Sequence, residues 1–292
     1  KFDKVISVER DSVTAETARV NFARLGASNI TVCTATAEDF LEEFAAKGLK
    51  ADLVYVDPDR RSQDGKKQVR LEDCSPNVLA LLPLLKKTTR RIAIKASPMF
   101  DVGEAFRLFG PHCRVDVISI ANECKEVVIE LSEDINVPMI RATAVGKGAA
   151  EYPYTRPKVK SASFAPPYRY MPVPDVALRK ARITADWAAA NLPAAYATPG
   201  DGYVFFNDPP SGLLLGKVFE IIHTWEYSPR SIKKQLKDRG IKSAGIMLHG
   251  FPRTAAQICR DLGIREGGDT KLAFTRIEGT LWTLELKDLP LH

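Results

Sequence analysis

The sequence has few of the residues that build disulfide frameworks and metal sites. Its 292 residues include five cysteines and four histidines. The cysteines are scattered, odd in number and never spaced as Cys-x-x-Cys, so neither a disulfide scaffold nor a zinc site is predicted. We expect free thiols, as in a reducing cytoplasm, and no bound metal.

Long apolar runs and a secretory leader are also lacking. No stretch approaches the roughly 18 consecutive apolar residues that a membrane-spanning helix needs. The first four residues are not followed by an apolar segment of the length found in signal peptides. We therefore expect a cytoplasmic protein with no membrane partner, and the sequence leaves its oligomeric state open.

The sequence is rich in hydrophobic residues and carries a net positive charge. Hydrophobic residues make up 45% and charged residues 27% of the chain, values typical of a globular protein with a buried core. The length suits two domains, or one domain with an appendage. The net charge of +6 favours anionic partners, nucleic acid first, although an excess of this size also fits an ordinary charged surface.

Residues 1–135 alternate between strand-like and helix-like segments. Strands are expected at 5–8, 29–33, 52–56 and 91–95, and helices at 12–25, 37–46, 77–85 and 103–109. Two further β-rich runs, 115–120 and 126–131, are separated only by a polar turn and predict an antiparallel hairpin at the edge of the sheet. The alternation predicts an α/β domain with a mostly parallel sheet and helices on both faces.

The composition changes after residue 135. Residues 136–174 are rich in Pro, Gly, Lys and Tyr, which predicts a linker with some extended segments. Residues 175–218 are expected to form a small α+β, ferredoxin-like segment, with a helix at 175–190 that Asp175 caps. Residues 219–292 predict a further α+β domain with a basic helix at 228–239 and a hairpin that turns at Glu278-Gly279.

Acidic groups follow two of the strands predicted in the first part of the chain. Glu9 comes directly after the strand at 5–8, and Asp57-Pro58-Asp59-Arg60-Arg61 follow the strand at 52–56. Open α/β sheets bind ligands at the carboxyl ends of their strands, where a carboxylate can accept hydrogen bonds from both ribose hydroxyls of a nucleoside. Each group alone could be an exposed charge in a turn, but together they favour a nucleoside site.

Four segments, in this order and spacing, resemble the class I S-adenosylmethionine-dependent methyltransferases. They are VISVERD at 5–11, TATAEDF at 34–40, LVYVDPDRR at 53–61 and RIAIKASPMFD at 91–101. The sequence is most similar to a bacterial group with a THUMP-like C-terminal domain, to which 174–183 and 262–274 also correspond. The resemblance covers nearly the whole chain, and its motifs are moderately specific together and weak singly. It implies a Rossmann-like methyltransferase domain at 1–135, a THUMP-like RNA-binding domain at 219–292, S-adenosylmethionine as cofactor and RNA as substrate.

The resemblance also implies roles for individual residues. Those that it places at the cofactor are Glu9, Arg10, Thr36, Ala37, Glu38 and Asp57. Those that it places near the transferred methyl group are Asp57, Pro58 and Arg60. The acceptor pocket would be shaped by Lys95 and Ser97.

The sequence departs from the family pattern in three places. It begins just before the second strand, so we expect a sheet without its central first strand and without the glycine-rich loop that follows that strand. Thr36 stands where such enzymes often hold an Asp against the adenine. Arg60 stands where enzymes that methylate base amines have an aromatic residue, which weakens the case for that chemistry. For Cys74 and Cys124, the candidates for a nucleophile, a thiol without a role is the simpler interpretation, and we name none.

The helix predicted at 228–239 carries a basic stripe. Ile232 and Leu236 lie four residues apart and can face inward, which leaves four basic residues exposed: Lys233, Lys234, Lys237 and Arg239. Such a stripe can neutralise RNA phosphates, although a solvated helix face is an equally common explanation. More positive charge follows at Lys242, His249, Arg253, Arg260, Arg265 and Lys271. We therefore expect Lys233, Lys234 and Lys237 to contact the RNA substrate.

The leading hypothesis is a methyltransferase that acts on RNA. One alternative is an RNA-binding protein whose methyltransferase fold has lost activity, with which Thr36 and Arg60 are compatible. Another is a methyltransferase of a substrate other than nucleic acid, which the basic C-terminal region disfavours. The sequence does not indicate which RNA or which atom would be methylated.

Overall fold

The computed structural model describes residues 2–59, 69–155, 163–192, 194–209 and 215–289. The role predicted for Arg60 therefore lies outside the described residues. The chain divides into two compact units, of which unit 1 comprises Lys1–Val115 and Glu126–Pro138 and unit 2 comprises Asp116–Lys125 and Met139–His292. Strands β5 (Cys113–Ile120) and β6 (Glu123–Ser132), the predicted hairpin, contribute residues to both units.

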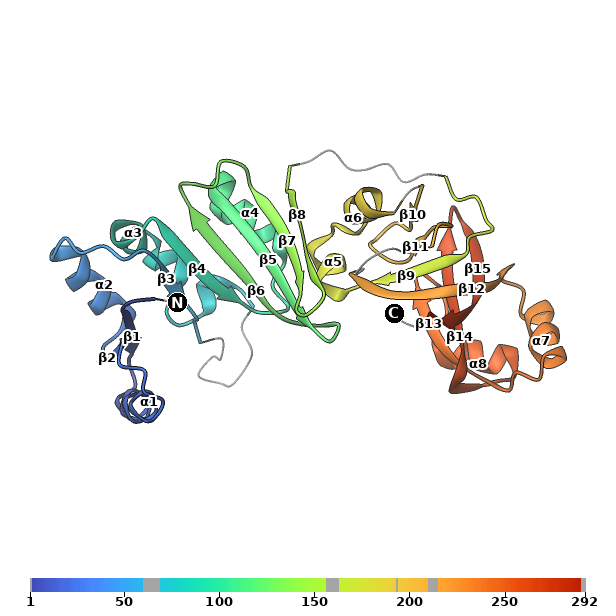
Figure 1. Ribbon diagram of the computed structural model, residues 1–292, viewed down its shortest axis with the longest axis horizontal. Coiled ribbons are helices and arrows are strands. Elements are labelled where there is room, and N and C mark those ends of the chain that lie inside the picture. The colour runs from blue at the N-terminus through green and yellow to red at the C-terminus, as the bar shows by residue number, and fades with distance from the viewer. Residues whose placement is uncertain (1, 60–68, 156–162, 193, 210–214, 290–292) are drawn as a thin grey trace. The chain divides into compact units, whose positions relative to one another are not determined.

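Unit 1 alternates strands and helices along the sequence, as its apolar spacing predicts (Figure 1). Besides its parts of β5 and β6, its strands are β1 (Val5–Glu9), β2 (Ile30–Thr34), β3 (Val54–Val56) and β4 (Arg91–Ala96). Its α-helices are α1 (Ser12–Arg24), α2 (Ala37–Ala46), α3 (Val78–Thr88) and α4 (Val102–Phe109). Two short 3-10 turns lie at Leu71–Asp73 and Gly110–His112.

The parallel strands of unit 1 belong to two separate sheets. β1 and β2 form a parallel pair of their own, whereas β3 begins a six-stranded sheet with the order β3-β4-β6-β5-β7-β8. β3 is parallel to β4, and β4 is antiparallel to β6. Within the described residues no strand joins the two parallel pairs.

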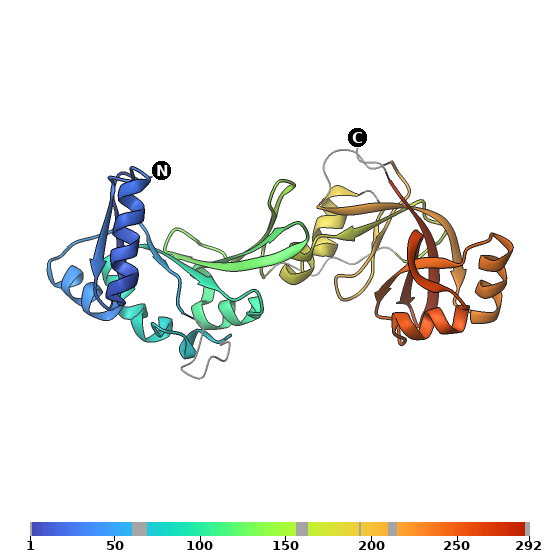
Figure 2. The same cartoon turned by 90° about the horizontal axis from the view of Figure 1, so that it is seen from below.

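Helices cover one face of β3, β4 and β6. Ile92, Ile94 and Ile129 are buried on this face, and Figure 2 shows α3 and α4 on the same side of these strands. Alternate residues of the strands point to the other face, where Glu130 forms ion pairs with both Arg91 and Arg114. For these three strands, the expectation of helices on both faces is therefore not met in the part of the chain that the structure describes.

Unit 2 is built on a five-stranded sheet in the order β13-β14-β15-β12-β9. Its strands are β7 (Met139–Ala144), β8 (Gly148–Pro153), β9 (Tyr170–Pro174), β10 (Tyr196–Ala197), β11 (Val204–Phe205), β12 (Gly216–Glu226), β13 (Ser243–His249), β14 (Arg265–Ile277) and β15 (Thr280–Asp288). Its helices are α5 (Val176–Ala181), α6 (Thr184–Asn191), α7 (Pro229–Asp238) and α8 (Ala255–Leu262). Only β13 and β14 pair in parallel among the five strands.

The segment at 136–174, where the composition predicts a linker, contains three strands. β7 and β8 pair with each other, and β9 joins the five-stranded sheet through β12. The domain boundaries expected from the sequence, at 135, 174 and 218, remain predictions.

The single helix predicted at 175–190 is divided into α5 and α6. Arg182 takes a positive φ of 58°, which ends α5, and Ile183 is completely buried before α6 begins. A left-handed conformation is unfavourable for a residue with a side chain, so tertiary packing outweighs local helix propensity here. Asp175 caps α5 as predicted, accepting a hydrogen bond from the backbone N–H of Ala177.

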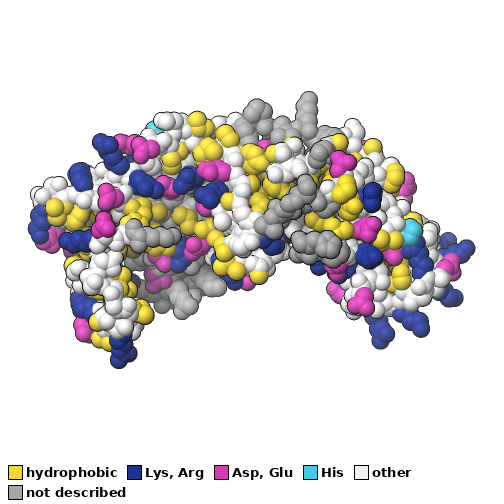
Figure 3. Space-filling model, in the orientation of Figure 1, with side chains coloured by type: hydrophobic (Ala, Val, Ile, Leu, Met, Phe, Trp, Pro, Cys, Tyr) yellow, Lys and Arg dark blue, Asp and Glu magenta, His cyan; other side chains and the backbone are white. Residues whose placement is uncertain are grey.

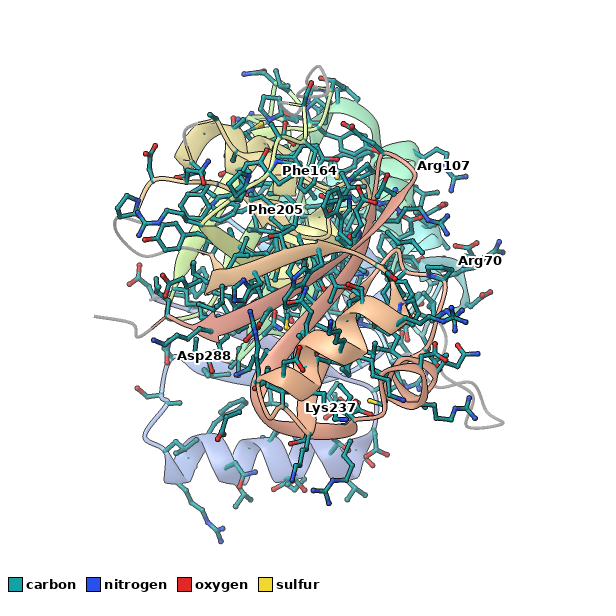
Figure 4. The ribbon with its side chains drawn as sticks, turned by 90° about the vertical axis from the view of Figure 1, so that its right-hand side faces the viewer. Arg70, Arg107, Phe164, Phe205, Lys237 and Asp288 are labelled. Carbon is teal, nitrogen blue, oxygen red and sulfur yellow. The ribbon has the colours of Figure 1, made fainter. Side chains whose placement is uncertain are left out.

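Apolar clusters cover both faces of the five-stranded sheet. The helix-side cluster lies between the sheet and α7 and α8 and includes Ile232, Leu236, Ile258, Leu262, Leu272 and Phe274. The aromatic cluster lies on the opposite face and includes Tyr168, Tyr196, Phe205, Leu284 and Leu286, with Phe164 and Trp282 packed against it. Figure 4 shows Phe164 and Phe205 on the far side of the sheet from the helix that carries Lys237.

Candidate functional site

The residues singled out in unit 1 lie at the carboxyl ends of three strands. Glu9 is the last residue of β1, Asp57 follows the last residue of β3, and Lys95 is the last but one of β4. Pro58 has no backbone N–H for a ladder and is itself buried, which is consistent with the early end of β3.

Asp57 and Lys95 form a direct pair. The pairing of Val56 with Ile94 places the next residues of the two strands side by side, and the Lys95 ammonium donates to Asp57 Oδ2 over 2.7 Å. This hydrogen bond is the main reason why the pKa of Lys95 is raised, so the ammonium stays charged at neutral pH. The Asp57 side chain is 45% exposed, and an ion pair so open to water adds little stability and remains accessible to a ligand.

Tyr55 belongs to the same surface as this pair. It lies two residues before Asp57 and therefore points to the same face of β3. Partial burial and then the charge of Asp57 raise the pKa of its phenol, which is neutral and able to donate a hydrogen bond at neutral pH. This spacing of two in a strand could have identified Tyr55 from the sequence.

A chain of hydrogen bonds ties the end of β1 to the segment after β3. The Arg10 guanidinium donates to Ser75 Oγ over 2.9 Å. Ser75 and Asp59 in turn exchange backbone hydrogen bonds of 2.8 and 3.0 Å. The strand ends of two separate sheets therefore converge within unit 1. The sequence could not indicate this link, because Arg10 and Ser75 are 65 positions apart.

Glu9 retains capacity to bind a ligand. Its Oε1 accepts a hydrogen bond from the backbone N–H of Asp11 over 2.8 Å, which holds the carboxylate at the start of α1. Among the described residues no donor reaches Oε2. That oxygen can accept from a hydroxyl group brought by a ligand.

Other predicted site residues have local structural roles. Thr36 is the N-cap of α2, and its hydroxyl accepts from the Asp39 N–H over 3.1 Å while its own hydrogen remains free to donate. Ala37 and Glu38 open the first turn of that helix, with Glu38 exposed. Ser97 is buried, and its hydroxyl accepts from the Met99 N–H over 3.1 Å.

Three of the cysteines lack the features of an activated nucleophile. Burial raises the pKa of Cys113 to about 12 and also raises that of Cys124. The Cys74 thiol is buried and donates to the Arg70 carbonyl over 3.2 Å. Within the described part of the chain, no group of three or more His, Cys, Asp or Glu residues could hold a metal, and no helix is long and apolar enough to cross a membrane.

In unit 2, α7 presents the predicted lysines to solvent. Ile232 and Leu236 are buried in the helix-side cluster, whereas Lys233, Lys234 and Lys237 are exposed and form no ion pair with any described residue. Lys and Arg side chains gather over α7 in the surface view (Figure 3). Pro229 is the first residue of the helix, and the side chain of its N-cap, Ser228, makes no capping hydrogen bond.

Not all of the predicted basic residues remain free. Arg239 is exposed as predicted, but it is not free, because it forms an ion pair with Glu285 and lies over the Trp225 ring at 5.4 Å. Arg253 pairs with Asp261, and Lys271 with Asp288. Other exposed positive charges of the same region include Arg230, Lys242, Arg260 and Arg265.

Three comparisons with known proteins bear on this arrangement. Residues 216–287 match the family described as THUMP domain-like. These residues are a THUMP-like domain. They include β12 to β14, most of β15, α7 and α8, so the basic helix α7 belongs to this domain.

The fold of the whole chain is shared with a solved structure. The chain superimposes with a TM-score of 0.81 and 21% identity on the crystal structure of a “putative methyltransferase from Porphyromonas gingivalis W83”, over 99% of this chain and 72% of that one. A curated relative from Enterococcus faecalis (strain ATCC 700802 / V583), named “Uncharacterized RNA methyltransferase”, is 28% identical over 103 residues. That match covers 35% of this chain and only 23% of the relative.

Proposed function

We propose that the protein is an S-adenosylmethionine-dependent methyltransferase that acts on RNA. The observations that carry the proposal are the fold shared over nearly the whole chain with the Porphyromonas gingivalis structure and a THUMP-like domain whose α7 exposes unpaired lysines. The name of the Enterococcus relative supports RNA as the substrate class. In this proposal residues 1–135 bind the cofactor, and residues 219–292 bind RNA.

The strand ends of unit 1 fit a nucleoside cofactor. The open oxygen of Glu9 would accept from the ribose hydroxyls, and Arg10, Thr36, Ala37 and Glu38 would border the nucleoside. A bound S-adenosylmethionine would supply a methyl group activated by its sulfonium.

Asp57 and Lys95 would act on the acceptor group. Lys95 remains positively charged and holds one oxygen of Asp57, which leaves the other oxygen to accept a hydrogen bond from the acceptor. Buried Pro58 would fix the direction of Asp57, and Arg60 and Ser97 would help to position the substrate.

Cofactor binding tests the first half of the proposal. In calorimetric titration of S-adenosylmethionine into the protein, Glu9→Ala should weaken binding roughly 10-fold or more, because charged hydrogen bonds to the ribose are lost. Glu16→Ala removes the same charge from the exposed side of α1 and should bind as the unchanged protein does. Absence of binding, or equal effects of the two substitutions, would contradict the proposed site and favour an RNA-binding protein without activity.

RNA binding tests the second half. Replacing Lys233, Lys234 and Lys237 by Gln should weaken binding of a structured RNA and reduce its dependence on salt, by about one unit of slope per lost phosphate contact. The matched control replaces Lys47, Lys86 and Lys87 in unit 1, which are also exposed. If neither set of substitutions changes the affinity for RNA, α7 does not bind the RNA.

A further inference from the structure

A bulge in β12 changes which side chains face the helices of the THUMP-like domain. The pairing of β12 with β15 shifts between Ile221 and His223, so that Ile221 lies opposite Leu286 and His223 opposite Glu285. Ile221 and Leu286 belong to the aromatic-cluster face, whereas Glu285 points to the other face. The bulge therefore turns His223 and Trp225 to the side of α7, where regular alternation would have turned them away.

The two reoriented rings form an ordered stack. His223 and Trp225 lie with centroids 5.4 Å apart and planes 21° from parallel. Arg239, at the end of α7, places its guanidinium 5.4 Å from the centre of the Trp225 ring, and its ion pair with Glu285 holds it there. The platform, defined as His223, Trp225 and Arg239, is thus fixed from β12, β15 and α7.

The platform remains partly open to solvent. His223 and Trp225 are only half-buried, unlike the rings at the centre of the two apolar clusters. Glu285 is neutralised by Arg239, and the free ammonium groups of Lys233, Lys234 and Lys237 are carried by the same helix as Arg239. Partly exposed aromatic rings and unpaired cations on the same domain suit single-stranded nucleic acid, because bases can stack on the rings while phosphates meet the cations.

We propose that His223, Trp225 and Arg239 form a stacking platform for an unpaired nucleotide of RNA. This inference rests on the proposed RNA-binding role of α7 and adds a preference for single-stranded over fully paired RNA. The lysines supply affinity that depends on salt and not on strandedness, and the platform supplies the preference.

The test compares a short single-stranded oligoribonucleotide with a blunt-ended RNA duplex of equal length. Trp225→Ala should weaken binding of the single strand by roughly 5- to 100-fold, the range for loss of one base–aromatic stack. Binding of the duplex should stay the same. Phe2→Ala, which removes an exposed aromatic ring in unit 1, serves as the matched control and should change neither.

Tryptophan fluorescence gives a second measurement that does not depend on the fold surviving Trp225→Ala. The single strand should quench the fluorescence of the unchanged protein. Trp225→Phe keeps a ring for stacking, so it should retain binding within a few-fold but lose the quenching. The other two tryptophans remain as internal references, Trp187 being buried and Trp282 packed against the aromatic cluster.

Two results would overturn the platform. One is an equal loss of single-strand and duplex binding in Trp225→Ala, and the other is quenching that persists in Trp225→Phe. If the unchanged protein binds neither RNA, the proposed RNA-binding function fails as well. If it binds both but ignores substitutions at Trp225, only the platform fails.

Discussion

The β1–β2 pair of unit 1 and the five-stranded sheet of unit 2 bury their apolar residues to very different degrees. Helix α1, which packs on the pair, has Ala15 as its one buried residue, and Val13 in the helix and the C-cap residue Leu25 are 72% and 78% exposed. The five-stranded sheet is covered on both faces, and Phe274 is completely buried on the helix side.

The difference shows that a region can form regular strands and helices without burying a hydrophobic core. Both regions form the elements that their apolar spacing predicts, but only the sheet of unit 2 removes large apolar surfaces from water on two sides. Burial of apolar surface is the main favourable term in folding. We therefore expect stability to be concentrated in the THUMP-like domain and to be low around β1, α1 and β2.

Hydrogen exchange would test this expectation most broadly. Amides of β1, α1 and β2 should exchange about 100-fold or more faster than those of β12, β14 and β15, because local opening of the less buried region costs less free energy. Mass spectrometry of peptides from 5–34 and from 216–288 measures the difference. Equal protection in the two sets would show that the comparison fails.

A pair of alanine substitutions sharpens the comparison at single residues. Phe274→Ala should lower the free energy of unfolding by about 3–5 kcal/mol, since Phe274 fills the space beside Tyr227 and Phe251. Val13→Ala should change it by no more than about 0.5 kcal/mol. All three tryptophans lie in unit 2, so fluorescence during denaturation follows that unit, and circular dichroism is needed for the Val13 variant.

Asp175 tests how far unit 2 depends on a buried polar contact as well as on apolar burial. Its Oδ1 accepts from Ser119 Oγ over 2.5 Å and from the Ala177 N–H over 3.0 Å. Asp175→Ala should cost about 1–3 kcal/mol, because both donors lose their acceptor in a buried place. Asp175→Asn retains an acceptor oxygen and should cost less, and a larger loss for Asn than for Ala would refute this account.

The smallest expected effect is on the stability of the fold at acidic pH. Hydrogen bonds from Lys217 and then Lys271 lower the pKa of Asp288 below its ordinary value of 3.8. A lowered pKa stabilises the fold above the ordinary value, and this contribution is lost as the pH falls through the folded value. Because the side chain is half-exposed, the contribution is roughly 0.2–1 kcal/mol. In acid titrations that follow unit 2, Asp288→Asn should remove this small pH dependence of the free energy of unfolding below about pH 4. A titration curve that Asp288→Asn leaves unchanged would show that Asp288 makes no such contribution.

Local patterns were sufficient for much of the fold and for part of the candidate site. Apolar spacing predicts α1, α2 and α4, and Glu278-Gly279 predicts the hairpin of β14 and β15, which the structure confirms with positive φ at both residues. The positions of Glu9 and Asp57 follow from the same patterns. A residue that ends or directly follows a predicted strand lies at the carboxyl end of that strand, where α/β sheets bind ligands.

Contacts between distant residues were decided only by the tertiary structure. The division of α5 from α6 at Arg182 follows from burial of Ile183, and the hydrogen bond of Arg10 to Ser75 joins segments that no local pattern relates. Trp225 is the clearest case, because one extra residue in β12 reverses the face on which its ring lies. The period of a strand determines only that neighbours alternate, and the register with β15 determines to which side each of them points.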